Sequence, residues 1–225
     1  MKVLLVLVSV FLFTQIAHGE DILKDFDSLG GNDVLMNRAK LLQPEKDVSI
    51  VQNRIVKRKW RNELSPTYTN FIGGDAYVET QSLGLDYHLH INHQWSVGVS
   101  YFTAFNKLSR EGRYLIDSEE LIPDVDQPES GYEILANFSP IYGKVNLFDM
   151  GVLQFDIYGI GTYGKIKLKS GDTNTYSAGL GLGLWISQHL TSRLEIRQRF
   201  YEAQRFDGAT DIEATLASLS FGYML

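Results

Sequence analysis

From about residue 60 to the end of the chain, apolar and polar side chains alternate with a period of two. A clear example is the series Leu83, Leu85, Tyr87 and Leu89, whose intervening residues are small or polar. This period gives a β-strand one apolar and one polar face. Ordinary strands average about five to six residues, whereas a strand tilted across a bilayer needs about nine to eleven. Eight segments of membrane-spanning length show the pattern: 60–71, 77–91, 94–106, 131–141, 151–164, 174–187, 191–203 and 212–225.

The two faces of these segments differ in kind. One face carries Leu, Ile, Val and Ala in mid-strand, with aromatic residues nearer the strand ends. The other carries serine, charged residues and rows of glycine such as Gly179, Gly181 and Gly183. A soluble lipocalin-like barrel would turn its apolar face inward. Glycine rows exposed to water would only weaken the strands, so we place the apolar face toward lipid and the glycine face inside.

Hydrocarbon offers no partners to unpaired backbone groups, so a sheet that crosses a membrane must close on itself. The sequence therefore predicts an all-β fold, an eight-stranded antiparallel transmembrane β-barrel over residues 60–225 with a short N-terminal periplasmic extension. Connections such as Asn92-His93 and 188–190 are short, whereas 107–130 is long and acidic. Short turns at one end and longer loops at the other are typical of such barrels. We expect 107–130 to be a solvated surface loop, because charge runs usually are.

The first residues have the pattern of an export signal. Lys2 precedes an apolar run from Val3 to Ile16, and Ala17-His18-Gly19 supplies small residues at the positions that a signal peptidase reads. We expect a signal peptide over residues 1–19 and a periplasmic extension over residues 20–59. Together with the barrel pattern, this signal predicts a location in the bacterial cell outer membrane.

A basic run precedes the first strand segment: Lys57, Arg58, Lys59 and Arg61 surround Trp60. One interpretation is contact with anionic lipid headgroups or with a partner. The other is a solvated charge cluster, and we favour it because most charge runs have no further role.

Composition excludes several classes of function. The chain has a formal net charge of −6 and no cysteine. An acidic domain binds a phosphate backbone poorly, so we expect no nucleic-acid partner. The absence of cysteine excludes disulfides, thiolate zinc sites and cysteine nucleophiles.

The glycines from Gly159 to Gly164 spell G-x-G-x-x-G, but no helical pattern follows them, so we do not interpret them as a dinucleotide site.

Charged and histidine side chains recur on the glycine face, where buried charges must be paired. We predict that they form a polar network in the lumen, and that none is catalytic, cofactor-binding or metal-binding. A metal site built on Asp86, His88 and His90 with a ligand from Glu133 or Asp156 is the alternative. No nucleophile elbow accompanies the Ser, His and Asp residues, so we expect no enzyme and no cofactor. The predicted network consists of Asp86, His88, His90, Glu133, Asp156, Arg193, Glu195, Arg197 and Arg199.

Three stretches carry a resemblance: Val51-Gln-Asn-Arg-Ile55, Asn62-Glu-Leu-Ser-Pro66 and Tyr87-His-Leu89. Over residues 50–225 the chain resembles the outer-membrane β-barrel domain family of myxobacteria and predatory bacteria. The alternating apolar residues that end at Leu225 also resemble the strand that outer-membrane insertion machinery recognises, although Leu stands where Phe is commoner.

Some members of that family take part in envelope-spanning motility complexes. The resemblance therefore implies a structural or interaction role in the cell envelope, with a place in such a complex as one form of that role. The partners we expect are outer-membrane lipid, the insertion machinery and a periplasmic protein bound through residues 20–59. A narrow channel for ions or small solutes, and less strongly a lipid-modifying barrel enzyme, are the alternatives.

Overall fold

The computed structural model describes residues 56–119, 124–146 and 152–225. The predicted signal peptide and residues 20–55 of the predicted extension lie outside these residues. Among the described residues, no helix is long and apolar enough to cross a membrane.

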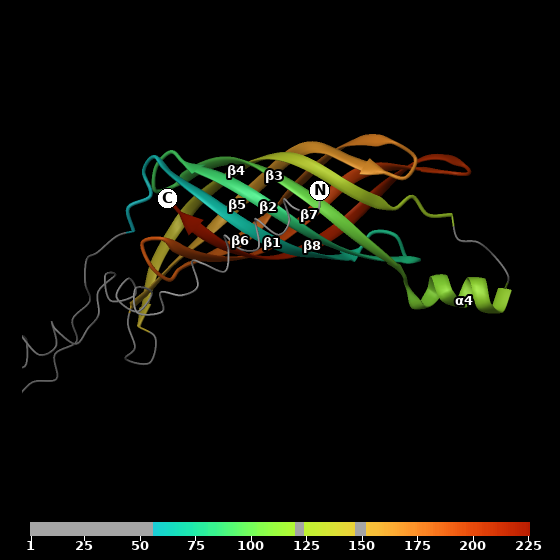
Figure 1. Cartoon of the computed structure of the whole chain (residues 1–225), viewed down its shortest axis with the longest axis horizontal. Coiled ribbons are helices and arrows are strands. Elements are labelled where there is room, and N and C mark those ends of the chain that lie inside the picture. The colour runs from blue at the N-terminus through green and yellow to red at the C-terminus, as the bar shows by residue number, and fades with distance from the viewer. Residues whose placement is uncertain (1–55, 120–123, 147–151) are drawn as a thin grey trace, which may run out of the picture.

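Eight antiparallel strands form one closed barrel in which each strand pairs with its neighbours in sequence and β1 pairs with β8 (Figure 1). The predicted fold class is confirmed, and each predicted segment overlaps one strand. The single described helix, α4 (Arg110–Glu119), lies between β3 and β4. The strands are β1 (Arg61–Gly73), β2 (Val78–His90), β3 (Trp95–Leu108), β4 (Pro128–Asn146), β5 (Val152–Leu168), β6 (Asp172–Trp185), β7 (Leu190–Arg205) and β8 (Gly208–Met224).

The pairing register fixes how the strands tilt. A row of paired residues that leaves β1 at Asn62 passes through Gly161 on β5 and returns to β1 at Ile72. The row has then advanced by ten residues along β1, from 62 to 72. Such a stagger requires strands that are inclined to the barrel axis.

The outer surface of the barrel is apolar. Leu180, Ile196 and Ile134 are about two-thirds exposed, with relative exposures of 66%, 66% and 65%. A water-soluble protein rarely exposes so continuous an apolar surface. Aromatic residues follow the two edges of this belt, among them Tyr132 and Tyr163 toward the α4 end, and Trp95 and Tyr223 toward the other end. The predicted outward orientation of the apolar face is confirmed.

The interior has two parts. At the end where β1 starts and β8 ends, the interior is polar, as predicted. Toward the α4 end it is an apolar cluster, which corrects the expectation of a wholly glycine, serine and ionic interior. Large apolar side chains alternate inward there, and of these only Ile166 and Leu168 lie beyond the predicted segments. The cluster consists of Phe71, Phe102, Ile166, Leu168, Tyr201, Ala203, Ile212, Ala214 and Leu216.

The expected contrast between short turns and long loops is wrong in part. At the α4 end, the connections 74–77, 169–171 and 206–207 are as short as those at the opposite end. The strands extend at this end and use the residues that would have formed loops. Connection 109–127 is long, but it contains α4, where we expected only a solvated loop. The Ser109 hydroxyl caps this helix by accepting a hydrogen bond from the Gly112 amide at 3.1 Å.

Candidate functional site

The polar half of the barrel interior is the candidate site, and all nine residues of the predicted network line it. The strands bring them together because their side chains alternate inward with a period of two. Seven are buried, and Asp86 and Glu195 are partly buried. They do not form one continuous ladder. They divide into three groups at successive depths, each built around a carboxylate.

Glu63 on β1 is the centre of the first group, and its side chain is fully buried at 0% exposure. The Arg193 guanidinium donates two hydrogen bonds to it, from Nε to Oε1 at 3.1 Å and from Nη2 to Oε2 at 2.6 Å. His90 Nε2 lies 2.7 Å from Oε2, and the Thr191 hydroxyl donates to Oε1 at 2.6 Å. The two hydrogen bonds from the Arg193 guanidinium form a bidentate pair, which is the strongest geometry for an ion pair.

Sequence reasoning missed Glu63. It lies on the polar face of β1, in the series Glu63, Ser65, Thr67 and Thr69. That alternation was the signal that could have found it. The apolar positions of β1 are interrupted by Pro66 and Asn70, so the segment alternates less cleanly than the others.

The second group closes the mouth at the end where the barrel chain begins and ends. Arg58 Nη1 donates to Asp156 Oδ2 at 2.6 Å, and the indole of Trp185 donates to Asp156 Oδ1 at 3.0 Å. The Arg58 guanidinium also lies 4.2 Å from the Trp185 ring centre, within cation–π range. Val56 is buried beside them, and its amide donates to Gln154 at 3.1 Å.

Arg58 corrects the interpretation of the basic run as a solvated cluster. Its side chain is 3% exposed and enters the barrel, whereas Lys57 and Lys59 are exposed. The reason is Asp156, an inward carboxylate whose burial requires a counterion. Val56 and Arg58, which the prediction placed in the extension, therefore pack in the barrel mouth.

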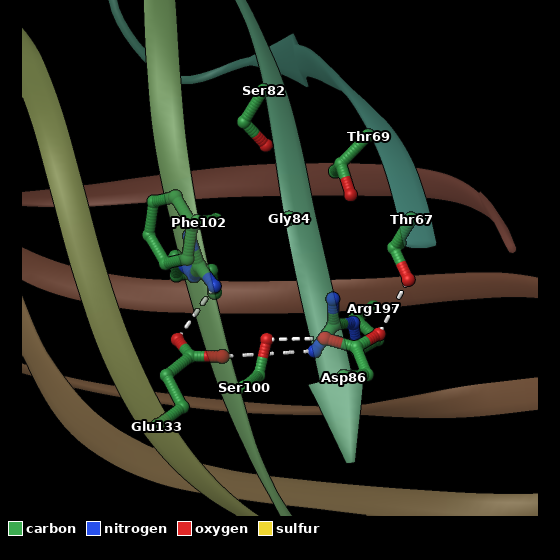
Figure 2. A pocket seen from close by; sticks show the side chains of 10 residues that line it. Thr67, Thr69, Ser82, Gly84, Asp86, Ser100, Phe102, Glu133 and Arg197 are labelled. Carbon is green, nitrogen blue, oxygen red and sulfur yellow. Dashed lines mark hydrogen bonds and ion pairs between the residues drawn. The ribbon is translucent and has the colours of Figure 1, made fainter. Parts of the chain in front are cut away.

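The third group lies in mid-barrel, and Figure 2 shows two of its members, Glu133 and Arg197. Arg199 Nη2 contacts Glu133 Oε1 at 2.5 Å, and Arg197 lies 3.7 Å from the same carboxylate and 3.5 Å from Glu195. Arg199 also stacks over the Phe102 ring at 4.7 Å, where the polar half of the interior meets the apolar cluster.

Asp86 faces the same space but is held by hydroxyl groups. Thr67 donates to its Oδ2 at 2.6 Å, and Ser100 donates to its Oδ1. His88 is buried nearby and stacks with His90 at a ring separation of 6.4 Å. In the described part of the chain, no three His, Asp or Glu side chains are grouped as metal ligands. The alternative metal set is therefore not brought together there.

Side chains fill this interior. The cavity between Asp86, Glu133 and Arg197 has a volume of about 10 Å³, room for about one water molecule. The inward glycines provide space for large neighbours. A Cβ at Gly181 would lie 2.2 Å from the Tyr158 ring, and the Tyr158 hydroxyl donates to Glu195 at 2.7 Å. The arrangement braces the barrel, and its far end is closed by the apolar cluster.

No protein-family model and no curated protein matches the sequence. Among solved structures, Ail of Yersinia pestis is similar at 13% identity, with 74% of this chain and 99% of that chain covered and a TM-score of 0.36. The outer membrane protein AlkL is similar at 10% identity, with 80% and 97% covered and a TM-score of 0.37. A designed transmembrane β-barrel is similar at 10% identity, with 76% and 100% covered and a TM-score of 0.39. These similarities concern barrel architecture alone, and none transfers a residue or a role to this chain.

Proposed function

We propose that this protein is a bacterial outer-membrane β-barrel with a structural or interaction role in the cell envelope. In this role the barrel is a rigid anchor that holds one segment on each side of the membrane. The observation that carries the proposal is the filled interior. The ion pairs of Glu63, Asp156 and Glu133 span the polar half, and the apolar cluster occupies the rest.

A filled interior argues against a conducting role. Moving an ion along the axis would require separating buried pairs, and leaving one partner unpaired costs about 3–5 kcal/mol. The ion would then meet an apolar plug, where no polar groups replace its hydration shell. An anchor gains from the same features, because paired charges and packed rings hold the strands in one register.

The mouth that Arg58 closes is the end of the barrel from which the chain before β1 continues, and this indicates how the barrel is oriented in the membrane. Residues 56–58 are tied to the barrel wall, so the remainder of the predicted extension, residues 20–55, joins the barrel at a fixed point. We propose that this end faces the periplasm and that the extension binds a periplasmic protein. The α4 connection then lies outside the cell. Membership of the myxobacterial and predatory-bacterial barrel family, and a place in an envelope-spanning complex, belong to the same proposal.

Conductance in a planar bilayer tests the proposal against a channel. The full chain without its predicted signal peptide is inserted, and a general porin in the same membrane is the positive control. We expect no stepwise current from this barrel. Regular steps that change when Arg197 is replaced by Gln would contradict the anchor role and favour a narrow channel.

Affinity capture from envelope extracts tests the interaction role. Wild-type protein is compared with a variant that lacks residues 20–55 and retains the Arg58 contact to Asp156. We expect a periplasmic protein to be captured by the wild type and lost with the deletion. An unchanged set of captured proteins would argue against a role for the extension.

A further inference from the structure

The Glu133 carboxylate on β4 has one oxygen that its ion pairs do not satisfy. The residue is buried, at 2% exposure, and its Oε1 contacts Arg199 at 2.5 Å. Its Oε2 lies 3.7 Å from Arg197 Nη1, which is an ion-pair distance but too long for a hydrogen bond. In the described part of the chain, no hydrogen-bond donor reaches Oε2. Buried polar atoms nearly always have a partner, so this oxygen requires an explanation.

The two arginines beside it have the opposite need. Arg197 and Arg199 are 6% and 2% exposed. Among the residues that the structure describes, the Nε–H groups of both guanidiniums make no hydrogen bond, although Arg197 Nε lies 3.5 Å from Glu195. One acceptor and at least two donors are therefore unsatisfied within a single group of side chains.

These side chains line one small cavity, and Figure 2 shows Glu133, Arg197 and Asp86 around it. Its volume of about 10 Å³ is the lower limit for one water molecule. Asp86 accepts hydrogen bonds from Thr67 at 2.6 Å and from Ser100. A carboxylate has about four acceptor positions, so Asp86 can accept a further bond from a molecule in the cavity.

The mixture of donors and acceptors selects the ligand. A metal cation would be attracted by the carboxylates, but it cannot accept hydrogen bonds from arginine and would be repelled by both guanidiniums. An anion would accept those bonds, but Glu133 and Asp86 would repel it. Water is neutral, donates and accepts, and fits the volume. A polar contact longer than about 3.5 Å, such as the one between Glu133 and Arg197, is also where a bridging water is expected.

We propose that this cavity binds one water molecule, which donates to Glu133 Oε2 and to Asp86 and accepts from Arg197 Nη1. Three hydrogen bonds are the usual number for a buried water. The water joins Asp86, which is otherwise held by hydroxyl groups, to the ion pairs of Glu133. It thereby connects β2, β4 and β7 through one polar network at mid-barrel.

A high-resolution crystal structure of the full chain without its predicted signal peptide tests the site. We expect one peak of electron density at about 2.7–3.2 Å from both Glu133 Oε2 and Arg197 Nη1. The same peak should be present in crystals grown without sodium or chloride. A peak that depends on either ion would overturn water as the ligand, and the absence of any peak would overturn the site.

Two variants at Ser82, which also lines the cavity, test the space itself. Ser82→Val adds methyl groups that fill it, whereas the matched control Ser82→Ala removes the hydroxyl without adding volume. We expect the density peak to remain in the alanine variant and to be lost in the valine variant. A peak that persists in the valine variant would overturn the placement; if that variant does not fold, the wild-type and alanine structures still decide the question.

The same structures separate this proposal from the anchor role. Absence of the single water would contradict only this site. A continuous file of waters from one mouth of the barrel to the other would overturn the single site, and with it the filled interior that carries the anchor role.

Discussion

Replacing Glu63 with alanine would leave the guanidinium of Arg193 buried without its carboxylate. In the native barrel, Glu63 accepts two hydrogen bonds from Arg193 and one from Thr191, and it contacts His90. The Arg193 side chain is itself buried, so water cannot replace the lost partner. The variant therefore tests whether the ion pairs in the lumen stabilise the folded barrel or only fill its interior.

The expected loss is large. Breaking a buried pair by removing one partner typically costs about 3–5 kcal/mol, because the remaining charge stays desolvated. Lys167→Gln is the matched control, since it breaks an exposed pair with Glu129 at 3.4 Å. Exposed pairs contribute about 0–1 kcal/mol. The double variant Glu63→Leu/Arg193→Leu removes both buried charges and should recover part of the loss.

Urea unfolding in lipid vesicles measures these differences as changes in the free energy of unfolding. We expect Glu63→Ala to be destabilised several times more than Lys167→Gln, and more than the double variant. If Glu63→Ala unfolds within about 1 kcal/mol of the wild type, the desolvation argument fails. If the double variant loses the sum of the losses measured for Glu63→Leu and Arg193→Leu singly, the two side chains act independently and the pairing is wrong.

Three further changes follow from the same structure. Gly181→Val should destabilise the barrel by at least about 1–3 kcal/mol in urea unfolding, because a Cβ there meets the Tyr158 ring at 2.2 Å. Gly159→Ala is the control and should not destabilise it, because a Cβ at Gly159 has no neighbouring atom within 4 Å. Equal effects of the two changes would refute the packing. Leu180→Arg should cost about 2–4 kcal/mol and lower the folded fraction on gels, because this side chain faces lipid at 66% exposure; an unchanged yield would refute the orientation. Arg58→Ala should release the chain before β1, so limited proteolysis should cut there faster than in the wild type; an unchanged digestion pattern would show that the contact to Asp156 does not hold it.

The strands could be predicted from the sequence because alternation is a local property. A segment such as β6 repeats glycine or serine inward and Ala178, Leu180 and Leu182 outward, so its face assignment needs no knowledge of its neighbours. Closure followed from the need to pair backbone groups in lipid. The extension of the strands toward the α4 end could not be predicted, because the alternation weakens beyond the apolar belt.

The pairing inside the lumen depends on register, which is not a local property. Glu63 and Arg193 are 130 residues apart and meet only because β1 and β7 both flank β8. The basic neighbours of Arg58 predict a solvated side chain, but the backbone turns at Trp60 and the Arg58 side chain is buried inside the barrel. The nine predicted lumen residues all line the interior. Which carboxylate each arginine contacts could be learned only from the three-dimensional structure.

Fluorescence quenching by brominated lipid tests the orientation of the two faces most directly. The chain has three tryptophans, so single-tryptophan variants are made by changing the others to phenylalanine. Trp95 is 47% exposed on the outer face, whereas Trp185 is 1% exposed inside. In vesicles with brominated acyl chains, Trp95 should be strongly quenched and Trp185 should keep most of its emission. Equal quenching of the two, or a chain that stays in solution unquenched, would contradict a barrel with its apolar face in lipid.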